Sequence, residues 1–209
     1  MPDYWSVPRL WEGETVTILG GGPSLRSVDL SRITGRVIAI NDAFKLKPDS
    51  DILYFCDRSW WDGPHGRSSE VCRKFDTVCR NFGGIVTLEN DIPGIKRLRN
   101  TGPTGLETDP AGLRHGSNSG YQCINLAYHL GVRRIVLLGF DMRCVDGSTH
   151  FNHRPEQQSV HGFERTLAVM LAKFETLVDP LKEAGVEVIN ATEGSRLECW
   201  PQTEKSAPW

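Results

Sequence analysis

Three histidines in the last third of the chain have the side-chain type for acid–base chemistry. His150 and His153 lie in the segment STHFNHRP, and His161 lies just before a periodic helix. A transfer to a hydroxyl group needs a base for the acceptor proton, and imidazole suits this task because its unperturbed pKa is near neutral pH. The pair His150 and His153, close to Asp141, equally suits a metal or phosphate cluster. Solvent-facing loop histidines are the simpler alternative for each.

A glycine-rich turn is the second feature that suggests chemistry. The apolar run TVTIL at 15–19 predicts a buried strand, which ends in Gly20-Gly21-Gly22. Glycine lets backbone N–H groups approach a ligand, and Pro23 and Ser24 suit the first turn and cap of a helix, whose N-terminus attracts anions. The turn therefore predicts an anion site, with a tight turn that binds nothing as the alternative. Its spacing matches neither the Rossmann dinucleotide fingerprint nor a Walker loop.

The elements that must position these residues follow from the apolar pattern. Further strands are predicted at 36–41, 51–57, 85–90, 134–141 and 186–190, and helices at 68–80, 119–130 and 163–181. Consecutive apolar residues in the strands indicate a parallel sheet covered on both faces, with 134–141 as a central strand. Ser119 is the expected cap of its helix, Gly131 the expected end, and Asp179-Pro180 should kink or split the last helix. The fold class is α/β: a single Rossmann-like domain with a mainly parallel, doubly wound sheet and helices on both faces.

The chain divides into three parts. Residues 1–14 are predicted to form an arm whose tryptophans, Trp5 and Trp11, pack back onto the domain at 15–198. Residues 91–117 are rich in Gly and Pro and carry several basic side chains, so we expect a long loop there. Residues 199–209 are expected to be a C-terminal tail.

Small or polar residues stand at the carboxyl end of every predicted strand or directly after it. They are Gly20 to Ser24, Asn41, Asp42, Asp57, Asn90, Asp141 and Asn190. Turn residues commonly end strands. Because the carboxyl ends of parallel strands share one edge, these residues jointly predict a polar pocket for a nucleotide, with a carboxylate for hydroxyls or a metal.

The composition excludes some classes of partner. A net charge of −2 gives no overall basic field for nucleic acid or an anionic membrane, although a local patch stays open. The six cysteines form no C-x-x-C pair, which favours reduced thiols in a cytoplasmic protein over disulfides or a zinc site. We find no signal peptide and no long apolar segment, so a soluble protein is expected.

Three blocks resemble a known superfamily. ILGGGPSL, VIAINDAF and GSNSGYQCINLAYHLGVRRIVLLGFDM are similar to stretches of the superfamily that joins bacterial lipooligosaccharide sialyltransferases to archaeal 6-hydroxymethylpterin diphosphokinase-like proteins, with frequent relatives in phage genomes. The resemblance covers 16–44 and 116–141 well, and 147–192 loosely. The chain has Gly21 where the transferases tend to have asparagine.

The resemblance implies a nucleotide-binding transferase. In it, Gly21 to Ser24 would hold phosphate and ribose, Asn41 would lie beside the donor, and His161 loosely occupies the place of the catalytic histidine. Together with the strand ends, the expected nucleotide contacts are Gly20, Gly21, Gly22, Pro23, Ser24, Asn41, Asp57, Asn118, Ser119, Gly120, Gly139 and Asp141.

The expected function is a glycosyltransferase that moves a sugar from a nucleotide donor to an acceptor hydroxyl without a required cofactor. A first alternative is a Mg²⁺-dependent pyrophosphokinase that uses ATP, with Asp141 near the ion. A second alternative is a phage protein that binds and sequesters a nucleotide metabolite without catalysis. We expect no membrane partner and no nucleic acid, and a homo-oligomer stays open.

Overall fold

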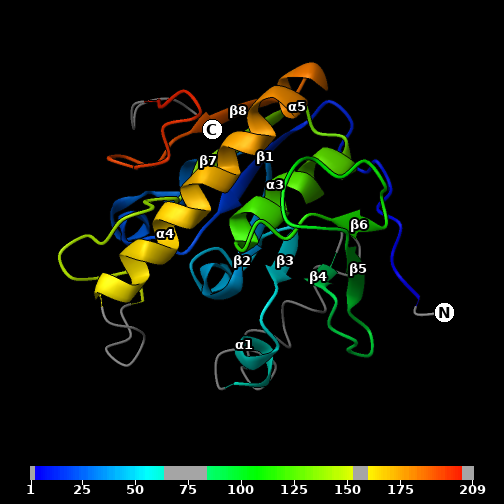
Figure 1. The fold of residues 1–209 in the computed structure, drawn as a ribbon, viewed down its shortest axis with the longest axis horizontal. Helices are drawn as coiled ribbons and strands as arrows, with labels where there is room; N and C mark the ends of the chain where they lie inside the picture. Colours follow the sequence, from blue (N-terminus) through cyan, green and yellow to red (C-terminus); the bar gives the residue numbers. More distant parts are fainter. Residues whose placement is uncertain (1–2, 64–83, 153–159, 204–209) are drawn as a thin grey trace.

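The computed structural model describes residues 3–63, 84–152 and 160–203, and side chains from residue 165 onward in the last of these ranges. Eight parallel strands form one sheet in the order β6-β5-β4-β3-β2-β1-β7-β8 (Figure 1). They are β1 Thr15–Leu19, β2 Arg36–Ile40, β3 Ile52–Phe55, β4 Gly84–Leu88, β5 Lys96–Asn100, β6 Gly112–Leu113, β7 Arg134–Leu138 and β8 Glu187–Asn190. The predicted parallel α/β class is confirmed. The helix expected at 68–80 lies outside the described residues.

Two expectations about the sheet are wrong. The segment 91–117 is not one long loop, because it contains β5 and β6 at the edge of the sheet. Only Leu98 is apolar and buried in β5, so its sequence KRLRN hides the strand. In addition, β7 is not central: it lies next to the edge strand β8. Strand β7 is apolar at consecutive positions because its residues are buried in the apolar clusters on both faces of the sheet.

The helices differ from the expectation in detail. Helix α3 is Ser119–Leu130, and its cap is Asn118 rather than Ser119, since the Asn118 side chain accepts hydrogen bonds from two backbone N–H groups of the first turn. Gly131 ends α3 with φ 89°, as expected. The last helix is split, as expected, into α4 Val160–Phe174, the 3-10 helix η4 Glu175–Leu177 and α5 Val178–Glu183.

Different helices cover the two faces of the sheet. In Figure 1, α3 and α4 cross the same face. Tyr121 of α3 and Phe174 of α4 belong to the apolar cluster on this face, with ring centroids 5.8 Å apart. The other face carries short helices: η1 Pro23–Ser27, η2 Leu30–Arg32, η3 Asn41–Lys45 and α1 Arg58–Asp62. Phe44 and Trp61 belong to the second apolar cluster on that face.

Both ends of the described chain pack onto the domain. Trp11 is 1% exposed, and the Trp5 N–H donates to the Arg97 carbonyl at 2.8 Å, so both tryptophans of the N-terminal segment lie against the domain. At the other end, Trp200 is buried, and the Asn190 N–H donates to the Pro201 carbonyl at 2.9 Å. The expectation of a tail from residue 199 is therefore wrong for residues 199–203.

The strand order reverses between β1 and β7. From β1 the chain moves through β2 to β6 in one direction, and α3 then returns it to β7 on the other side of β1. In doubly wound sheets, ligands bind outside the carboxyl ends of the strands at such a reversal. The glycine turn after β1 and Asp141 after β7 both lie there.

Candidate functional site

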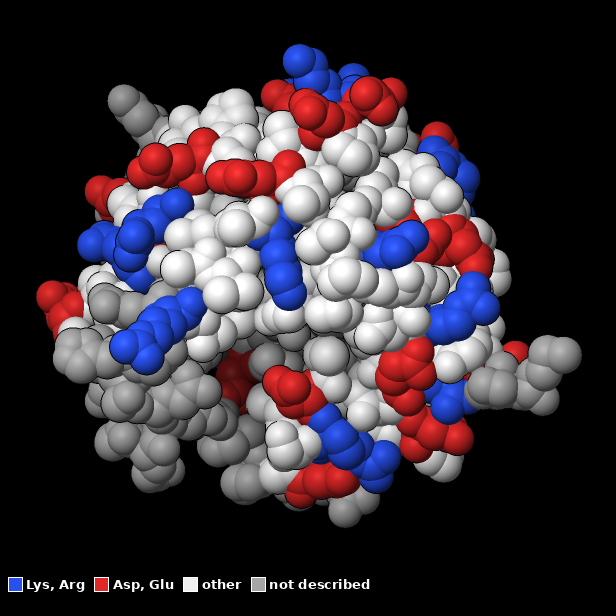
Figure 2. Space-filling view, in the orientation of Figure 1, with Lys and Arg blue, Asp and Glu red and all other residues white. Residues whose placement is uncertain are grey.

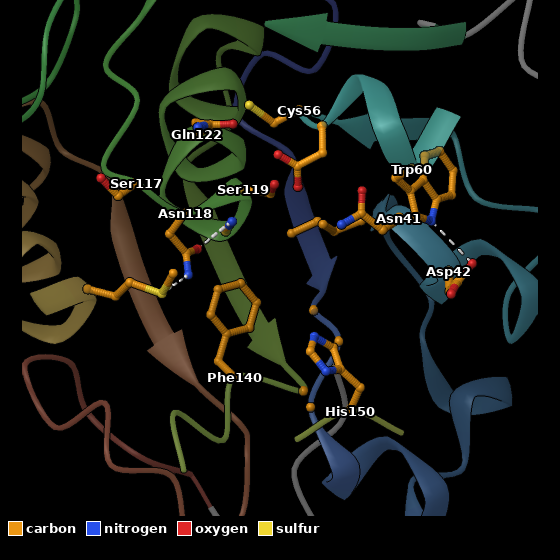
Figure 3. A pocket seen from close by; sticks show the side chains of 18 of the residues that line it. Asn41, Asp42, Cys56, Trp60, Ser117, Asn118, Ser119, Gln122, Phe140 and His150 are labelled. Carbon is orange, nitrogen blue, oxygen red and sulfur yellow. Dashed lines mark hydrogen bonds between the residues drawn. The ribbon is translucent and has the colours of Figure 1, made fainter. Parts of the chain in front are cut away.

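A cavity of about 1260 Å³ opens at the carboxyl ends of the strands, beside the start of α3. Figure 2 shows a recess in the lower part of the molecule with acidic side chains inside it. Figure 3 shows Asn118 and Ser119 at the start of α3 on one side of the cavity, with Asn41 and Trp60 on the other. The walls therefore come from both halves of the sheet.

The structure brings most of the predicted site residues together. The predicted residues that line the cavity are Gly20, Gly21, Gly22, Asn41, Asp42, Asp57, Asn90, Asn118, Ser119, Gly120, Gly139, Asp141 and His150. Pro23 and Ser24 are not among the lining residues. Asn190 does not line the cavity either, because it is buried and donates from Nδ2 to the Leu197 carbonyl. His153 lies outside the described residues, and of His161 only the backbone in α4 is described.

Two of the backbone donors that the sequence assigned to an anion at the glycine turn bind protein acceptors instead. The Gly20 N–H donates to the Leu138 carbonyl at 2.8 Å, and the Gly22 N–H to the Gly139 carbonyl at 2.9 Å. Ser24 is not a helix cap, since the N-cap of η1 is Gly22. Protein acceptors therefore occupy these donors of the turn.

The Asp141 carboxylate stands where an anion was expected. Its Oδ1 accepts from the Ser24 N–H at 3.0 Å and its Oδ2 from the Ser24 hydroxyl at 2.7 Å. A Cβ on residue 22 would collide with this carboxylate, which explains Gly22 without a ligand. Burial raises the pKa of Asp141, and the hydrogen bonds from Ser24 partly oppose this shift. Asp141 thus joins the end of β7 to the turn after β1.

Asn41 has an unused acceptor at the cavity wall. Its backbone is left-handed with φ 49°, a conformation that asparagine tolerates better than most residues. Its side chain lines the cavity, where the Oδ1 atom is buried and has no hydrogen-bond partner (Figure 3). Most buried polar atoms in folded proteins have a partner.

Trp60 is held in position by a buried carboxylate. The indole Nε1–H donates to Asp42 at 3.3 Å, while Lys45 and Asn152 donate to the same carboxylate at 2.8 and 2.5 Å. Asp42 therefore joins η3, α1 and the loop after β7. This network orients an aromatic ring that lines the cavity.

His150 is the one predicted histidine whose side chain the structure describes. Its ring lies beside Gly21, where a Cβ would be 3.1 Å from the ring carbon Cδ2, and its Nδ1 is 2.9 Å from the Thr149 hydroxyl. Arg26 donates to the carbonyls of His150 and Phe151, which fixes this loop on η1. Burial lowers the pKa of His150, so the imidazole is neutral at pH 7.

His115 also lines the cavity, and the sequence did not single it out. Its Nδ1 accepts from the Ser117 N–H at 3.0 Å, and Lys173 donates to the Ser117 hydroxyl at 2.6 Å. Burial, followed by the charge of Lys173, lowers the pKa of His115. A neutral His115 with Nδ1 as acceptor carries its proton on Nε2, so it is a donor rather than a base. Its place in HGSNS, directly before α3, is the signal that could have found it.

Cys56 lines the cavity as a thiol. Burial raises its pKa to about 11, so it is not an activated nucleophile. The neighbouring Gln122 is also engaged: it accepts from the Tyr54 hydroxyl at 2.8 Å and donates to the His115 carbonyl at 2.7 Å.

The carboxylates of the cavity are not gathered into a metal site. Asp42, Asp57, Glu89 and Asp141 all line it. Within the part of the chain that the structure describes, no three His, Cys, Asp or Glu side chains are close enough together to hold a metal ion. Both oxygens of Asp141 already accept hydrogen bonds from Ser24.

Comparison with known proteins leaves the family open. No protein-family model matches the chain, and no curated protein matches it. The resemblance to the sialyltransferase and diphosphokinase superfamily therefore stays a prediction from three sequence blocks. None of the described helices has the length and apolar character needed to cross a membrane.

Proposed function

We propose that the protein is a transferase that binds a nucleotide-activated donor, most simply a sugar nucleotide, and passes the sugar to an acceptor hydroxyl. The observation that carries the proposal is the unpartnered Oδ1 of Asn41 at the wall of the cavity. A buried acceptor without a donor costs about 1–3 kcal/mol, which an N–H or O–H of a ligand would offset.

The size of the cavity favours two substrates. Small-molecule sites typically measure roughly 300–1,000 Å³, and this cavity measures about 1260 Å³. A donor and an acceptor therefore have room side by side. In the proposal, the ring of Trp60 lies against the base or sugar, and Asn41 and Ser119 contact polar edges of the donor.

His150 is the proposed base. In the proposal, the acceptor hydroxyl gives its proton to Nε2, and Nδ1 carries the other proton, which the Thr149 hydroxyl at 2.9 Å can accept. The acceptor oxygen forms a bond to the anomeric carbon as the bond from that carbon to the donor phosphate breaks. The nucleotide leaves with the electron pair of that bond, so charge and atoms balance.

Ligand-induced thermal stabilisation tests the proposal, with CMP, UDP, GDP, ADP, ATP and the matching sugar nucleotides, each with and without Mg²⁺. A ligand at 100 times its Kd adds about 2.7 kcal/mol of stability, which raises the Tm of a chain of this size by about 5–10 °C. We expect such a shift with a sugar nucleotide in the absence of Mg²⁺.

Asn41→Gly separates ligand binding from folding, because glycine adopts the left-handed backbone without strain. We expect it to fold as stably as the wild type and to bind the sugar nucleotide at least about tenfold more weakly. A response to ATP with Mg²⁺ alone would replace the proposal with pyrophosphoryl transfer. Tight binding without turnover of any donor would identify a sequestering protein. No binding of any nucleotide would refute all three.

A further inference from the structure

We propose that Arg143 binds the anionic group of the cavity's ligand, a single phosphate or carboxylate, in the role that the sequence assigned to the glycine turn. This inference rests on the proposed function, since it names which part of the donor or acceptor is recognised and by which residue.

Arg143 lines the cavity, and its guanidinium forms no hydrogen bond or salt bridge within the described part of the chain. Among the residues that the structure describes, no side chain or carbonyl accepts a hydrogen bond from its guanidinium, and its Nε is buried without an acceptor. By contrast, Arg36 pairs with Glu14 at 2.8 Å and Arg114 with Glu107 at 3.1 Å.

Asp141 carries a nearby charge of opposite sign. Burial raises the pKa of Asp141 and the charge of Arg143 partly lowers it, but no hydrogen bond or salt bridge joins the two among the described contacts. A guanidinium partly withdrawn from water without a hydrogen-bonded acceptor costs free energy of folding, which a bound anion would recover.

The loop after β8 is shaped around this guanidinium. Gly194 has φ +64°, and a Cβ there would lie 2.7 Å from Nη2 of Arg143. The left-handed backbone therefore favours glycine, and a side chain there would push the end of the Arg143 guanidinium aside. The loop is tied to the strand end beside it, because the Arg196 N–H donates to the Asp141 carbonyl at 3.0 Å. The guanidinium of Arg143 thus lies against a loop whose backbone is tied to the end of β7.

The charges on the cavity wall leave Arg143 as the place for an anion. The other described lining residues that carry a full charge are the carboxylates Asp42, Asp57, Glu89 and Asp141. Asp141 accepts two hydrogen bonds from Ser24, and its charge interacts with Arg143 without a salt bridge between them, so the guanidinium keeps its hydrogen-bond donors for a ligand. Asp42 is paired with Lys45 at 2.8 Å, and Arg143 is the one Lys or Arg among the described lining residues, so an anion is attracted to this guanidinium. Arginine can bind a phosphate or carboxylate through two parallel hydrogen bonds. One such group fits this balance better than a triphosphate.

The variants Arg143→Gln and Arg143→Lys test the assignment. Arg133→Gln is the matched control. Arg133 is exposed and directly precedes β7, so it lies at the amino ends of the strands, away from the cavity at their carboxyl ends. Calorimetry with nucleoside monophosphates and the corresponding nucleosides measures the contribution of the phosphate. We expect Arg143→Gln to bind monophosphates about tenfold to a hundredfold more weakly, Arg143→Lys to lie between it and the wild type, and nucleosides to bind all variants equally. A monophosphate affinity of Arg143→Gln within about twofold of the wild type and of Arg133→Gln overturns the inference.

A second measurement does not depend on nucleotide binding. The ¹⁵N signal of the Arg143 Nε–H group, identified by its loss in Arg143→Gln, is followed during titration with inorganic phosphate or acetate. A shift with phosphate assigns a phosphate site, and a shift with acetate alone assigns a carboxylate site; no shift with either overturns the inference. If the signal shifts but no nucleotide binds, the proposed function fails and the anion site stands. If nucleotides bind equally to the wild type and Arg143→Gln, the inference fails and the proposed function stands.

Discussion

Replacing Asp141 with alanine tests whether this carboxylate is structural. Its two oxygens accept from the Ser24 N–H and hydroxyl at 3.0 and 2.7 Å, so Asp141→Ala leaves two donors at the turn without a partner. Each loss costs about 1–3 kcal/mol. Burial of the charged carboxylate itself costs free energy, as its raised pKa shows, and the alanine variant no longer bears that cost. We therefore expect a net loss of about 2–4 kcal/mol in the free energy of unfolding. For a chain of this size, the Tm should fall by about 4–16 °C.

The isosteric variant Asp141→Asn sharpens the test. Its Oδ1 still accepts from the Ser24 N–H, and its amide nitrogen donates to the Ser24 hydroxyl, so we expect a loss below about 1 kcal/mol. Urea unfolding followed by tryptophan fluorescence and circular dichroism measures both values. Glu198→Ala removes an exposed carboxylate and should stay within about 0.5 kcal/mol of the wild type.

One pattern of results would refute this reasoning. If Asp141→Ala is as stable as the wild type, or more stable, and loses nucleotide binding, Asp141 is a ligand-binding group rather than a link between the strand end and the turn. Equal losses in Asp141→Ala and Asp141→Asn would show that the charge, rather than the hydrogen-bond geometry, is what Ser24 requires.

Three further predictions concern other parts of the chain. His150→Gln should lower kcat/KM by about 10²–10⁴-fold if His150 is the base, and a loss as large in His115→Gln, measured in the same transfer assay, would contradict that assignment. Burial lowers the pKa of His129 below its ordinary 6.5, so the unfolded chain binds more protons than the folded one at lower pH. Urea midpoints should therefore fall from pH 7 to pH 5, and less so in His129→Gln; an equal decline in both would count against this. Gly116 has φ +55°, and a Cβ there would collide with the Tyr121 ring, so Gly116→Ala should cost at least about 3 kcal/mol in the same assay; a loss below about 1 kcal/mol would be inconsistent with this packing.

The fold could be predicted because its strands are buried on both faces. Runs such as RVIAI in β2 and RIVLL in β7 are apolar at consecutive positions, which local sequence shows directly. Strand β5 could not be predicted in the same way. Two of its basic residues are covered by the N-terminal arm: Lys96 lies 4.5 Å from the Trp5 ring and Arg97 lies 5.0 Å from the Tyr4 ring. A charged edge strand covered by distant aromatic residues has the same local composition as a loop.

The candidate site shows the same limit. The strand ends Asn41, Asp57 and Asp141 lie on one cavity because parallel strands end at one edge, and topology alone predicts this. The contact of Asp141 with Ser24, 117 residues apart, could not be predicted. Because of it, a carboxylate of the protein occupies a backbone donor that the sequence assigned to a bound anion. Arg143 was one of several loop arginines in the sequence. Its lack of a partner is visible only when the surrounding side chains are in place.

The N-terminal arm also constrains the order in which the protein is completed during synthesis. The Val7 N–H donates to the Pro110 carbonyl at 3.0 Å and the Trp11 N–H to the Leu130 carbonyl at 2.8 Å. A ribosome produces the arm more than a hundred residues before the second of these acceptors. The Trp11 contact therefore cannot form until α3 has left the exit tunnel, and during that interval the Trp11 indole is open to other nascent chains.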